Sequence, residues 1–409
     1  MLSTDFITKL LDLKDIFVTN VAQHENSIVI EMEKPVEEQH CPCCGTATRT
    51  IHDYRKQDIK DIPVLGKTLI LRLRKRRYRC PECGKRFYEK VDFLPRYHRI
   101  TRRLAHYVIS ELASECSFTS VARKVSLSVP TVIRLFDYVN YGKPTLPAVL
   151  AIDEFKGNAG GSKYLGIITD PVNHRVLDIL PSREKHSLIQ YMKPLNRDDV
   201  KFFVSDMWET YRDLSDSFFK NATFIVDKYH FTRQTIWAFE AIRKQEQEKF
   251  GKTHRIYFKR SKSLLNKSFE YLSDDQKRQI NVMLSLSVPL SDSYFLKEKF
   301  LKIMGSKSKS EASQLLSDWI EYAYDSKLPP FRRCANTYLN WFTGITNVFD
   351  HRYTNGFTEG CNNKIKVLKR NAYGYRNFRR FRNRILFMFN ESFAQKQKAA
   401  IEKKSVAVA

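Results

Sequence analysis

The pattern of apolar and polar positions divides the chain into segments of different secondary structure. Apolar and polar residues alternate over residues 27–32 (SIVIEM), which predicts a strand, and residues 68–73 form another predicted strand. Residues 100–141 instead carry apolar residues three or four positions apart, which is the period of a helix. The first third of the chain is therefore predicted to contain strands followed by helices.

After residue 147 the pattern changes to short apolar runs. The five that predict strands are residues 148–152, 164–168, 175–180, 201–204 and 223–226. A helical pattern at 187–193 lies between the third run and the fourth, so this region is predicted to be a mixed α/β layer. Residues 142–147 (GKPTLP) contain one glycine and two prolines and are predicted to be a linker.

Helical patterns dominate the rest of the chain. Residues from about 231 to 335 are rich in Lys, Glu, Gln and Leu, and residues 355–390 form a strongly basic helical stretch. Residues 391–409 are expected to be a frayed tail. The α/β layer is thus predicted to be interrupted by a long helical block.

The charge balance indicates the kind of partner. The 409 residues include 70 Lys and Arg against 45 Asp and Glu, a net charge of +25, which favours nucleic acid or an anionic membrane surface. A hydrophobic fraction of 42% argues against disorder, no apolar run is long enough to span a bilayer, and the N-terminus lacks a signal pattern. We therefore expect a soluble cytoplasmic protein that handles nucleic acid and binds no membrane.

The eight cysteines indicate a metal site in a reducing compartment. Two Cys-x2-Cys pairs, each followed by glycine, supply four thiolates for tetrahedral zinc, namely Cys41, Cys44, Cys80 and Cys83. Cys43 is expected to point away, and a small hairpin around residues 68–73 is expected within the loop between the pairs. A chance cluster of free or redox-active cysteines is the alternative to this structural zinc site.

Two segments resemble DNA-binding elements. The residues of a basic run suited to phosphate contacts are Arg74, Lys75, Arg76, Arg77 and Arg79, although a solvated basic face is the alternative. Residues 118–125 and 129–138 predict a helix-turn-helix, in which Thr131, Arg134 and Asp137 face outward and Thr131 and Arg134 contact DNA. A helix pair in an ordinary bundle would show a similar pattern.

Carboxylates at the ends of predicted strands indicate a divalent-metal site. Asp153 ends one apolar run and Asp206 ends another, and Mg²⁺ or Mn²⁺ prefers such oxygen ligands. The third candidate is Glu359, which shares one helical face with three other polar residues: Asn363, Lys366 and Arg370.

Two alternatives remain for the aspartates. Glu154 could replace Asp153, but strand neighbours point to opposite faces, so only one of them can join the site. Asp227 could replace Asp206, because it also follows an apolar run. The Asp227-x2-His230 pair either positions a base or a DNA contact, or it only caps the following helix.

The order of these motifs resembles a known family. The segments CPCCG, RYRCPECGKRF, AIDEF, SDMWETY, VDKYHF and TNGFTEGCNNKIKVLKRNAYGYRNFRRFRNRI are similar to bacterial insertion-sequence transposases of the ISL3 family, over nearly the whole chain. The resemblance implies an RNase H-like core with a DDE triad, split by an insertion before the glutamate. The triad then falls on Asp153, Asp206 and Glu359, and Asp227 with His230 resembles the C/D(2)H signature of several DDE families.

Together these observations predict a DDE transposase. The zinc knuckle and the helix-turn-helix would bind the terminal inverted repeats, and Mg²⁺ or Mn²⁺ held by the triad would support strand cleavage and strand transfer without a covalent protein–DNA intermediate. The basic residues expected near phosphates are Lys364, Lys366, Lys369 and Arg370. Expected partners are double-stranded DNA and a second copy of the chain. A non-enzymatic DNA-binding regulator and a structure-specific nuclease are the alternatives.

The predicted fold is multidomain α/β, with a zinc ribbon-like knuckle, a helix-turn-helix and an RNase H-like mixed sheet interrupted by an all-helical insertion. The predicted parts are a zinc-binding domain (1–97), a helix-turn-helix domain (98–141), a linker (142–147), the first part of the core (148–235), the insertion (236–340), the second part of the core (341–392) and a flexible tail (393–409).

Overall fold

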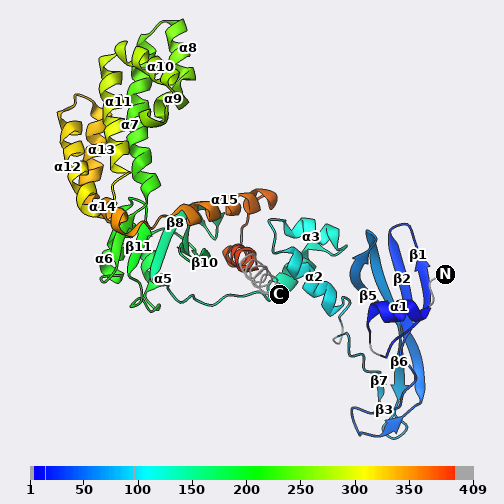
Figure 1. Cartoon of the computed structure of the whole chain (residues 1–409). Helices are drawn as coiled ribbons and strands as arrows, with labels where there is room; N and C mark the ends of the chain where they lie inside the picture. The colour runs from blue at the N-terminus through cyan, green and yellow to red at the C-terminus, as the bar shows by residue number, and fades with distance from the viewer. Residues whose placement is uncertain (1–3, 14, 95–97, 392–409) are drawn as a thin grey trace, which may run out of the picture. The chain divides into compact units, whose positions relative to one another are not determined.

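The chain forms two compact units in the computed structural model, which describes residues 4–13, 15–94 and 98–391 (Figure 1). Among these residues, the first unit contains the N-terminal part up to Tyr141 together with Val367–Gly374, and the second contains Gly142–Lys366 and the residues from Tyr375 onward. The tail predicted at 393–409 lies outside the described residues. No helix in the described part is long and apolar enough to cross a bilayer.

The first unit is built on a five-stranded sheet of order β1-β2-β6-β5, with β7 also pairing with β6. Its strands are β1 (Phe17–Gln23), β2 (Ser27–Glu33), β5 (Ile51–Val64), β6 (Lys67–Arg79) and β7 (Arg86–Tyr88). Helix α1 (Thr4–Leu11) contributes Leu11 to its core, beside alternating side chains of β6 such as Leu71 and Leu73. Both strands predicted in this region are confirmed. The predicted small hairpin is also present, but β5 and β6 make it much longer than expected.

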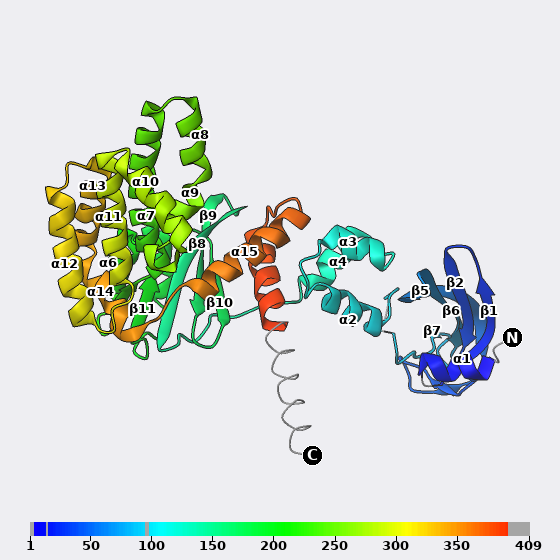
Figure 2. The same cartoon turned by 45° about the horizontal axis from the view of Figure 1, so that its top comes forward.

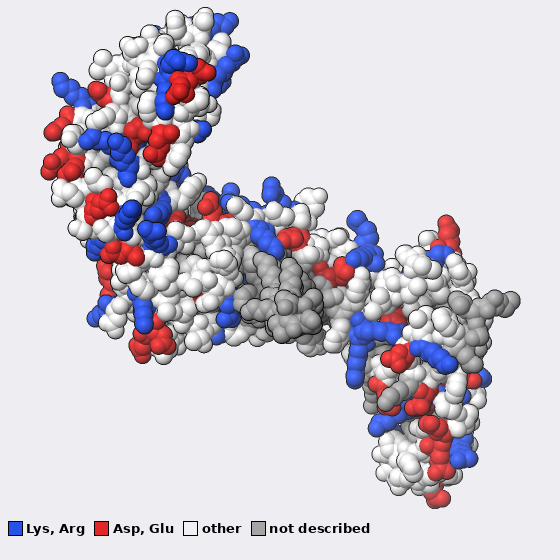
Figure 3. Space-filling view, viewed as in Figure 1, with Lys and Arg blue, Asp and Glu red and all other residues white. Residues whose placement is uncertain are grey.

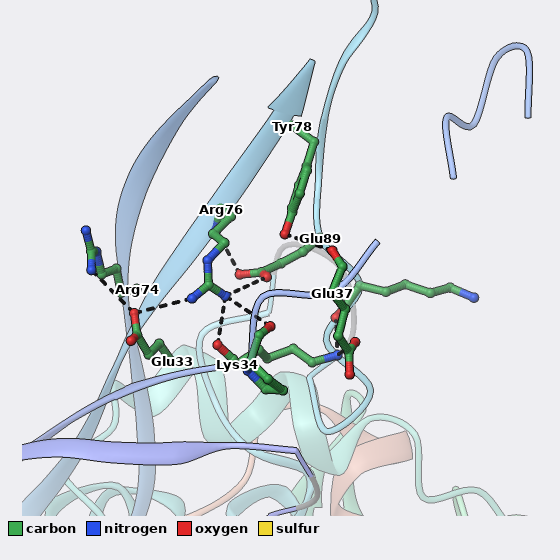
Figure 4. A network of polar contacts seen from close by, with 9 residues as sticks. Glu33, Lys34, Glu37, Arg74, Arg76, Tyr78 and Glu89 are labelled. Carbon is green, nitrogen blue, oxygen red and sulfur yellow. Dashed lines mark hydrogen bonds and ion pairs between the residues drawn. The ribbon is translucent and has the colours of Figure 1, made fainter. Parts of the chain in front are cut away.

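One basic residue predicted to contact phosphate has a structural position instead. Arg76 is buried on β6, and its guanidinium contacts Glu89, Glu33 and the backbone carbonyls of Lys34 and Pro35 (Figure 4). These contacts join the segment after β2 to β6 and to the segment after β7. Because a buried, paired guanidinium is not accessible to DNA, the phosphate contact predicted for Arg76 is corrected to a role in holding this unit together.

The predicted helix-turn-helix is present in the first unit. Helices α3 (Phe118–Lys124) and α4 (Val129–Phe136) follow α2 (Arg102–Glu111), and Ser126 in the turn has a φ of 54°. The small side chain of Ala122 is buried between them, as a close helix crossing requires.

The second unit contains the predicted mixed sheet, in the order β10-β9-β8-β11-β12. Its strands are β8 (Val149–Ala159), β9 (Ser162–Asp170), β10 (Arg175–Leu180), β11 (Phe202–Ser205) and β12 (Thr223–Val226). β8, β11 and β12 are parallel, whereas β9 runs antiparallel to β8 and β10. All five predicted strands are confirmed, and so is the predicted mixed sheet.

The two faces of this sheet have different cores. Leu150 and Ile152 of β8 pack toward the helices α5 (Lys185–Met192) and α6 (Glu209–Phe218). Ala151 of β8 and Val204 of β11 belong to the core of the opposite face, which continues into the helical block. Because side chains alternate along a strand, neighbouring residues of β8 belong to the cores on opposite faces of the sheet.

The helical block follows β12 and returns to it. It comprises α7 (Lys228–Lys249), α8 (Lys252–Arg260), α9 (Lys262–Asn266), α10 (Asp274–Ser285), α11 (Val288–Ile303), α12 (Lys309–Asp325), α13 (Pro329–Asn340) and α14 (Phe342–His351), with a short 3₁₀ turn η1 (Phe269–Tyr271). α7 leaves the sheet and runs into the block (Figure 1). The core of the block includes Trp319 and Tyr338. The predicted helical interruption of the sheet is confirmed.

The basic segment near the C-terminus forms two helices. α15 (Gly356–Asn371) is followed by a break at Tyr373 and Gly374, whose φ angles are 53° and 98°, and by helical residues 378–391. Gly374 has the left-handed backbone that glycine adopts without strain, which ends the first helix.

Candidate functional site

Three aspartates form one row across the parallel strands. The register pairs Val204 of β11 with Ala151 of β8 and with Ile225 of β12. Extending both pairings by two residues aligns Asp206 with Asp153 on one side and with Asp227 on the other. Residues two apart on a strand face the same way, so Asp153 lies on the same face of β8 as Ala151, which is the face that bears the helical block.

Asp153 differs from its expected position in one respect. It was predicted at the end of a strand, but β8 continues to Ala159 because it stays paired with β9 beyond the shorter β11. Asp206 follows the last residue of β11 as predicted. The site is therefore located where the neighbouring strands end beside a longer central strand.

Helix α15 is fixed to this row by two asparagines. Asn362 Nδ2 donates a hydrogen bond to Asp153 Oδ2 at 2.9 Å. The Asn355 backbone N–H donates to Asp227 Oδ1 at 3.0 Å, and Asn355 Nδ2 donates to the Ile152 carbonyl at 3.1 Å. Both asparagines are buried, so these bonds satisfy groups that water cannot reach.

Sequence reasoning missed these two asparagines. Asn355, Thr358 and Asn362 have the spacing of residues on one helical face, and Thr358 also bonds Thr169 of β9 at 2.7 Å between hydroxyl oxygens. The signal in the sequence is that these small polar residues recur on one face of a predicted helix, where a helix packed on a sheet would usually have apolar residues.

Glu359 lies in the first turn of α15, next to this polar stripe. Its side chain is exposed, yet its charge acts on the carboxylates of Asp153 and Asp227, so it lies within electrostatic range of the row. Asn363 and Lys366 are also exposed, and Lys366 Nζ donates to Asn363 Oδ1 at 3.2 Å. Arg370 is exposed too, so all four residues predicted to share one face of this helix are exposed.

Burial and repulsion between neighbouring carboxylates raise the pKa values of the aspartates in the row. Burial raises the pKa of Asp153 to about 7, and the charges of Glu154, Asp227 and Glu359 add to the effect. Burial likewise raises the pKa of Asp206 to about 7, together with the charges of Glu154 and Asp153. Asp206 Oδ1 is buried and has no hydrogen-bond partner among the described residues. Carboxylate oxygens are the donors that a hard divalent cation prefers, and Asp206 Oδ1 is the one oxygen of the row among the described residues that is buried without a partner.

Glu154 has its own partners on the other face of the sheet. Arg183 donates to Glu154 Oε1 at 2.9 Å, and the Tyr211 hydroxyl of α6 donates to Oε2 at 3.2 Å. Asp153 instead bonds α15, as strand alternation requires.

Asp227 and His230 lie at the start of α7. Asp227 occupies the N-cap position, and its Oδ2 is 4.0 Å from His230 Nε2. Burial lowers the pKa of His230, although Asp227 opposes the shift, and burial raises the pKa of Asp227. Because Asp227 also binds the Asn355 backbone, it has a part in positioning α15 besides its place at the helix start.

The four predicted cysteines form a zinc site in the first unit. Their sulfur atoms all lie within 4.8 Å of one another, and the closest pairs are 3.5 Å apart. Tetrahedral zinc with Zn–S bonds of ~2.3 Å requires sulfur separations of roughly 3.8 Å, so the arrangement fits the ion. Cys43 is not part of the cluster. No other group of three or more Cys, His, Asp and Glu residues in the described part of the chain is as compact.

The local backbone explains the geometry of the zinc site. Gly45 and Gly84 have φ angles of 76° and 67°, and each donates its N–H to the carbonyl of the first cysteine of its pair. Hydrogen bonds with Thr46 lower the pKa of Cys44 to about 6, whereas hydrogen bonds with the other three cysteines and burial raise the pKa of Cys83 to about 12.

The other predicted DNA-contacting residues differ in exposure. Arg74, Arg79 and Arg134 are exposed, whereas Lys75, Arg77, Thr131 and Lys364 are partly buried, and Lys366 is exposed on α15. Lys369 and Arg370 lie in the last turn of α15. On the face shown in Figure 3, basic and acidic side chains are interspersed over the helical block and do not form one basic patch.

Family comparisons match three parts of the chain. Residues 37–83 match a zinc finger of the transposases IS204, IS1001, IS1096 and IS1165. Residues 89–140 match the helix-turn-helix domain of transposase family ISL3, and residues 150–385 match the transposase domain of that family.

Individual proteins show the same relationship. The transposase for insertion sequence element IS1001 of Bordetella parapertussis is 27% identical over 348 residues, which cover 82% of this chain and 85% of that protein. The transposase for IS1557 of Mycobacterium tuberculosis is 28% identical over 126 residues, 31% of this chain and 28% of that protein. A Lactococcus lactis protein named ATP-dependent protease is 33% identical over 108 residues, 26% of this chain and 33% of that protein.

The zinc site gives a first prediction. Replacing Cys41 by serine should abolish stoichiometric zinc binding and unfold the knuckle, because the remaining three thiolates leave the tetrahedron incomplete. Elemental analysis of the purified protein and thermal unfolding measure this. Cys43→Ser is the matched control and should keep the full zinc content. Equal zinc loss in both variants would contradict the assignment of ligands.

The buried row gives a second prediction, for protein with zinc but without added magnesium or manganese. The pKa of Asp206 is raised from its ordinary value of 3.8 to about 7, so its contribution to stability is present below pH 3.8 and lost as the pH rises through 7. Asp206→Asn removes the buried charge and should raise the free energy of unfolding at pH 8 by about 1–3 kcal/mol.

Denaturant unfolding at pH 8 measures this difference. The control is Asp213→Asn, since Lys185 lowers the pKa of this exposed carboxyl and its loss should slightly destabilise the protein. The opposite result, a lower free energy of unfolding for Asp206→Asn at pH 8, would contradict the prediction. It would show that other groups compensate the charge of Asp206 in the folded protein.

Proposed function

The chain belongs to the ISL3 family of transposases, and on this basis we propose which of its residues act on DNA and how. It is a DDE transposase, an enzyme that acts on DNA, with a zinc ribbon and a DNA-binding helix-turn-helix. A non-enzymatic regulator is not favoured, because the match includes the transposase domain itself.

The proposed catalytic triad is Asp153, Asp206 and Glu359. One observation carries this assignment: the parallel register aligns the two aspartates, and α15 brings Glu359 within electrostatic range of the same row. A divalent cation, Mg²⁺ or Mn²⁺, bound by these oxygens would polarise the scissile phosphate and activate the attacking hydroxyl.

The remaining residues of the site hold this arrangement in place. Asn362 orients the Asp153 carboxylate by its hydrogen bond, so that one oxygen is fixed before any substrate arrives. Asp227 is proposed as an auxiliary acid, which fixes the start of α15 through Asn355 and keeps His230 close. Preorganised groups of this kind avoid reorganisation during the reaction.

DNA contacts are proposed on both units. Lys364, Lys366, Lys369 and Arg370 of α15 are suited to phosphates near the site, and Thr131 and Arg134 to base edges read by α4. The exposed residues Arg74 and Arg79, with Lys75 and Arg77, remain candidates for phosphate contacts. The target of this binding is proposed to be the terminal inverted repeats of the element. Processing two ends together favours a homodimer on DNA.

If the proposed triad is correct, a substitution in it should abolish DNA cleavage but leave DNA binding intact. Asp153→Asn should lower cleavage of a duplex containing the DNA that flanks the gene by at least about 100-fold, because the variant loses a charged ligand. Binding of the same duplex should change little, since the zinc ribbon and the helix-turn-helix are untouched. Labelled-strand cleavage assays and gel shifts measure the two effects.

Asp216→Asn, on the exposed side of α6, is the control and should cleave normally. Metal-dependent cleavage that persists in Asp153→Asn would refute the triad. Joining of the cleaved 3′ end to a second duplex separates a transposase from a structure-specific nuclease, which would cleave without joining.

A further inference from the structure

Helix α7 carries an exposed stack of two aromatic rings and one arginine. Tyr229 and Trp237 expose 48% and 56% of their surface, although large aromatic side chains are usually buried. The guanidinium carbon of Arg233 lies between them, 4.9 Å from the Tyr229 ring centroid and 4.5 Å from that of Trp237. The three residues are four positions apart, so they form one stripe along the helix.

The stack is ordered but its polar groups are not satisfied. Arg233 Nε is buried and has no hydrogen-bond partner among the described residues. The two rings hold the guanidinium by cation–π contacts, which leaves its N–H groups available to an acceptor. Arg233 as a whole is only partly buried, so its terminal nitrogens rather than the buried Nε are suited to a ligand that brings an acceptor.

The stripe begins at the candidate active site. Asp227 immediately precedes α7, and the Tyr229 ring packs edge-on against His230 with centroids 5.7 Å apart. The charge of Arg233 acts on His230, which is itself within 4.0 Å of Asp227. α7 then continues away from the sheet into the helical block (Figure 2). A ligand on the stripe would thus extend from the row of acids along α7.

We propose that Tyr229, Arg233 and Trp237 bind an unpaired base of the DNA strand next to the scissile phosphate. The proposal rests on the function proposed above and specifies how the substrate is held. An aromatic ring stacks with the flat face of a base, and that face is accessible only when the base leaves the duplex. Stacking of this kind tolerates any base because every base has a flat face, and the arginine supplies donors for the adjoining phosphate.

A similar stack elsewhere provides a control surface. Lys299 of α11 lies over the rings of Phe295 and Tyr322, 5.1 and 3.8 Å from their centroids, and both rings are about as exposed as those on α7. This second stack belongs to α11 and α12, and no interaction connects it to the row of acids in the part of the chain that the structure describes. Tyr322→Ala therefore removes an equivalent exposed ring at a different place.

The experiment uses the full-length zinc-loaded protein and a duplex with one unpaired 2-aminopurine at its end. Stacking on Trp237 should quench the fluorescence of this base, and Trp237→Ala should abolish the quenching and weaken binding about 10-fold. Trp237→Phe should restore most of the binding, because a ring is again present. Tyr322→Ala should behave like the unaltered protein. A fully paired duplex should bind all four proteins equally.

Several results would overturn the proposal. They are an absence of quenching with the unaltered protein, equal affinity of Trp237→Ala for the unpaired probe, and equal weakening of both probes by Trp237→Ala. The fluorescence measurement does not depend on cleavage, so it tests the two proposals separately. Quenching without any strand cleavage would contradict the proposed function but support the base-binding site. Cleavage without quenching would support the proposed function but contradict the base-binding site.

Discussion

The register of three parallel strands is the constraint on which the candidate site depends. β8, β11 and β12 pair so that Asp153, Asp206 and Asp227 fall into one row, although long segments separate them along the chain. The apolar residues one row earlier are Ala151, Val204 and Ile225, all buried, so the sheet cannot slip by one residue without exposing them. The packing that stabilises the sheet thereby places the acids where their charges repel.

The helical block leaves the sheet and returns to it, and so brings α15 to the site without disturbing the row of acids. Its first helix, α7, starts at the end of β12, and its last helix, α14, packs on the same strand. Asn347 of α14 donates to the Phe224 carbonyl at 2.8 Å, and a side chain at Gly344 would lie 2.8 Å from Val226. A long insertion whose ends meet costs little in loop closure, provided that it has its own core. The chain can therefore leave the sheet and return to place α15 over the row.

Much of this arrangement could be predicted from the sequence, because apolar runs and turn residues are local signals. All five core strands, the helix-turn-helix helices and the zinc knuckles have the expected positions. The sequence could not show which residue of the basic run on β6 is buried. Buried positions on β6 are odd-numbered up to Leu73 and even-numbered from Arg76, and this change of phase places Arg76 inside, although nothing in a run of arginines marks it. The roles of Asn355 and Asn362 likewise depend on which helix covers the sheet.

Two arginines near the acids are held by aromatic rings, and they differ in whether a carboxylate pairs with them. Arg183 lies over the rings of Tyr164 and Trp208, at 4.3 and 5.0 Å, and donates to Glu154, so its charge offsets an acid on the far face of the sheet. Arg233 is held in the same manner, but no carboxylate pairs with it among the described residues. The charge of Arg183 also opposes the raised pKa of Asp206, but burial and the neighbouring carboxylates outweigh it, so the row remains short of positive charge. A phosphodiester can approach such a surface only when a cation compensates the row, which is the electrostatic condition that a metal-dependent reaction on DNA requires.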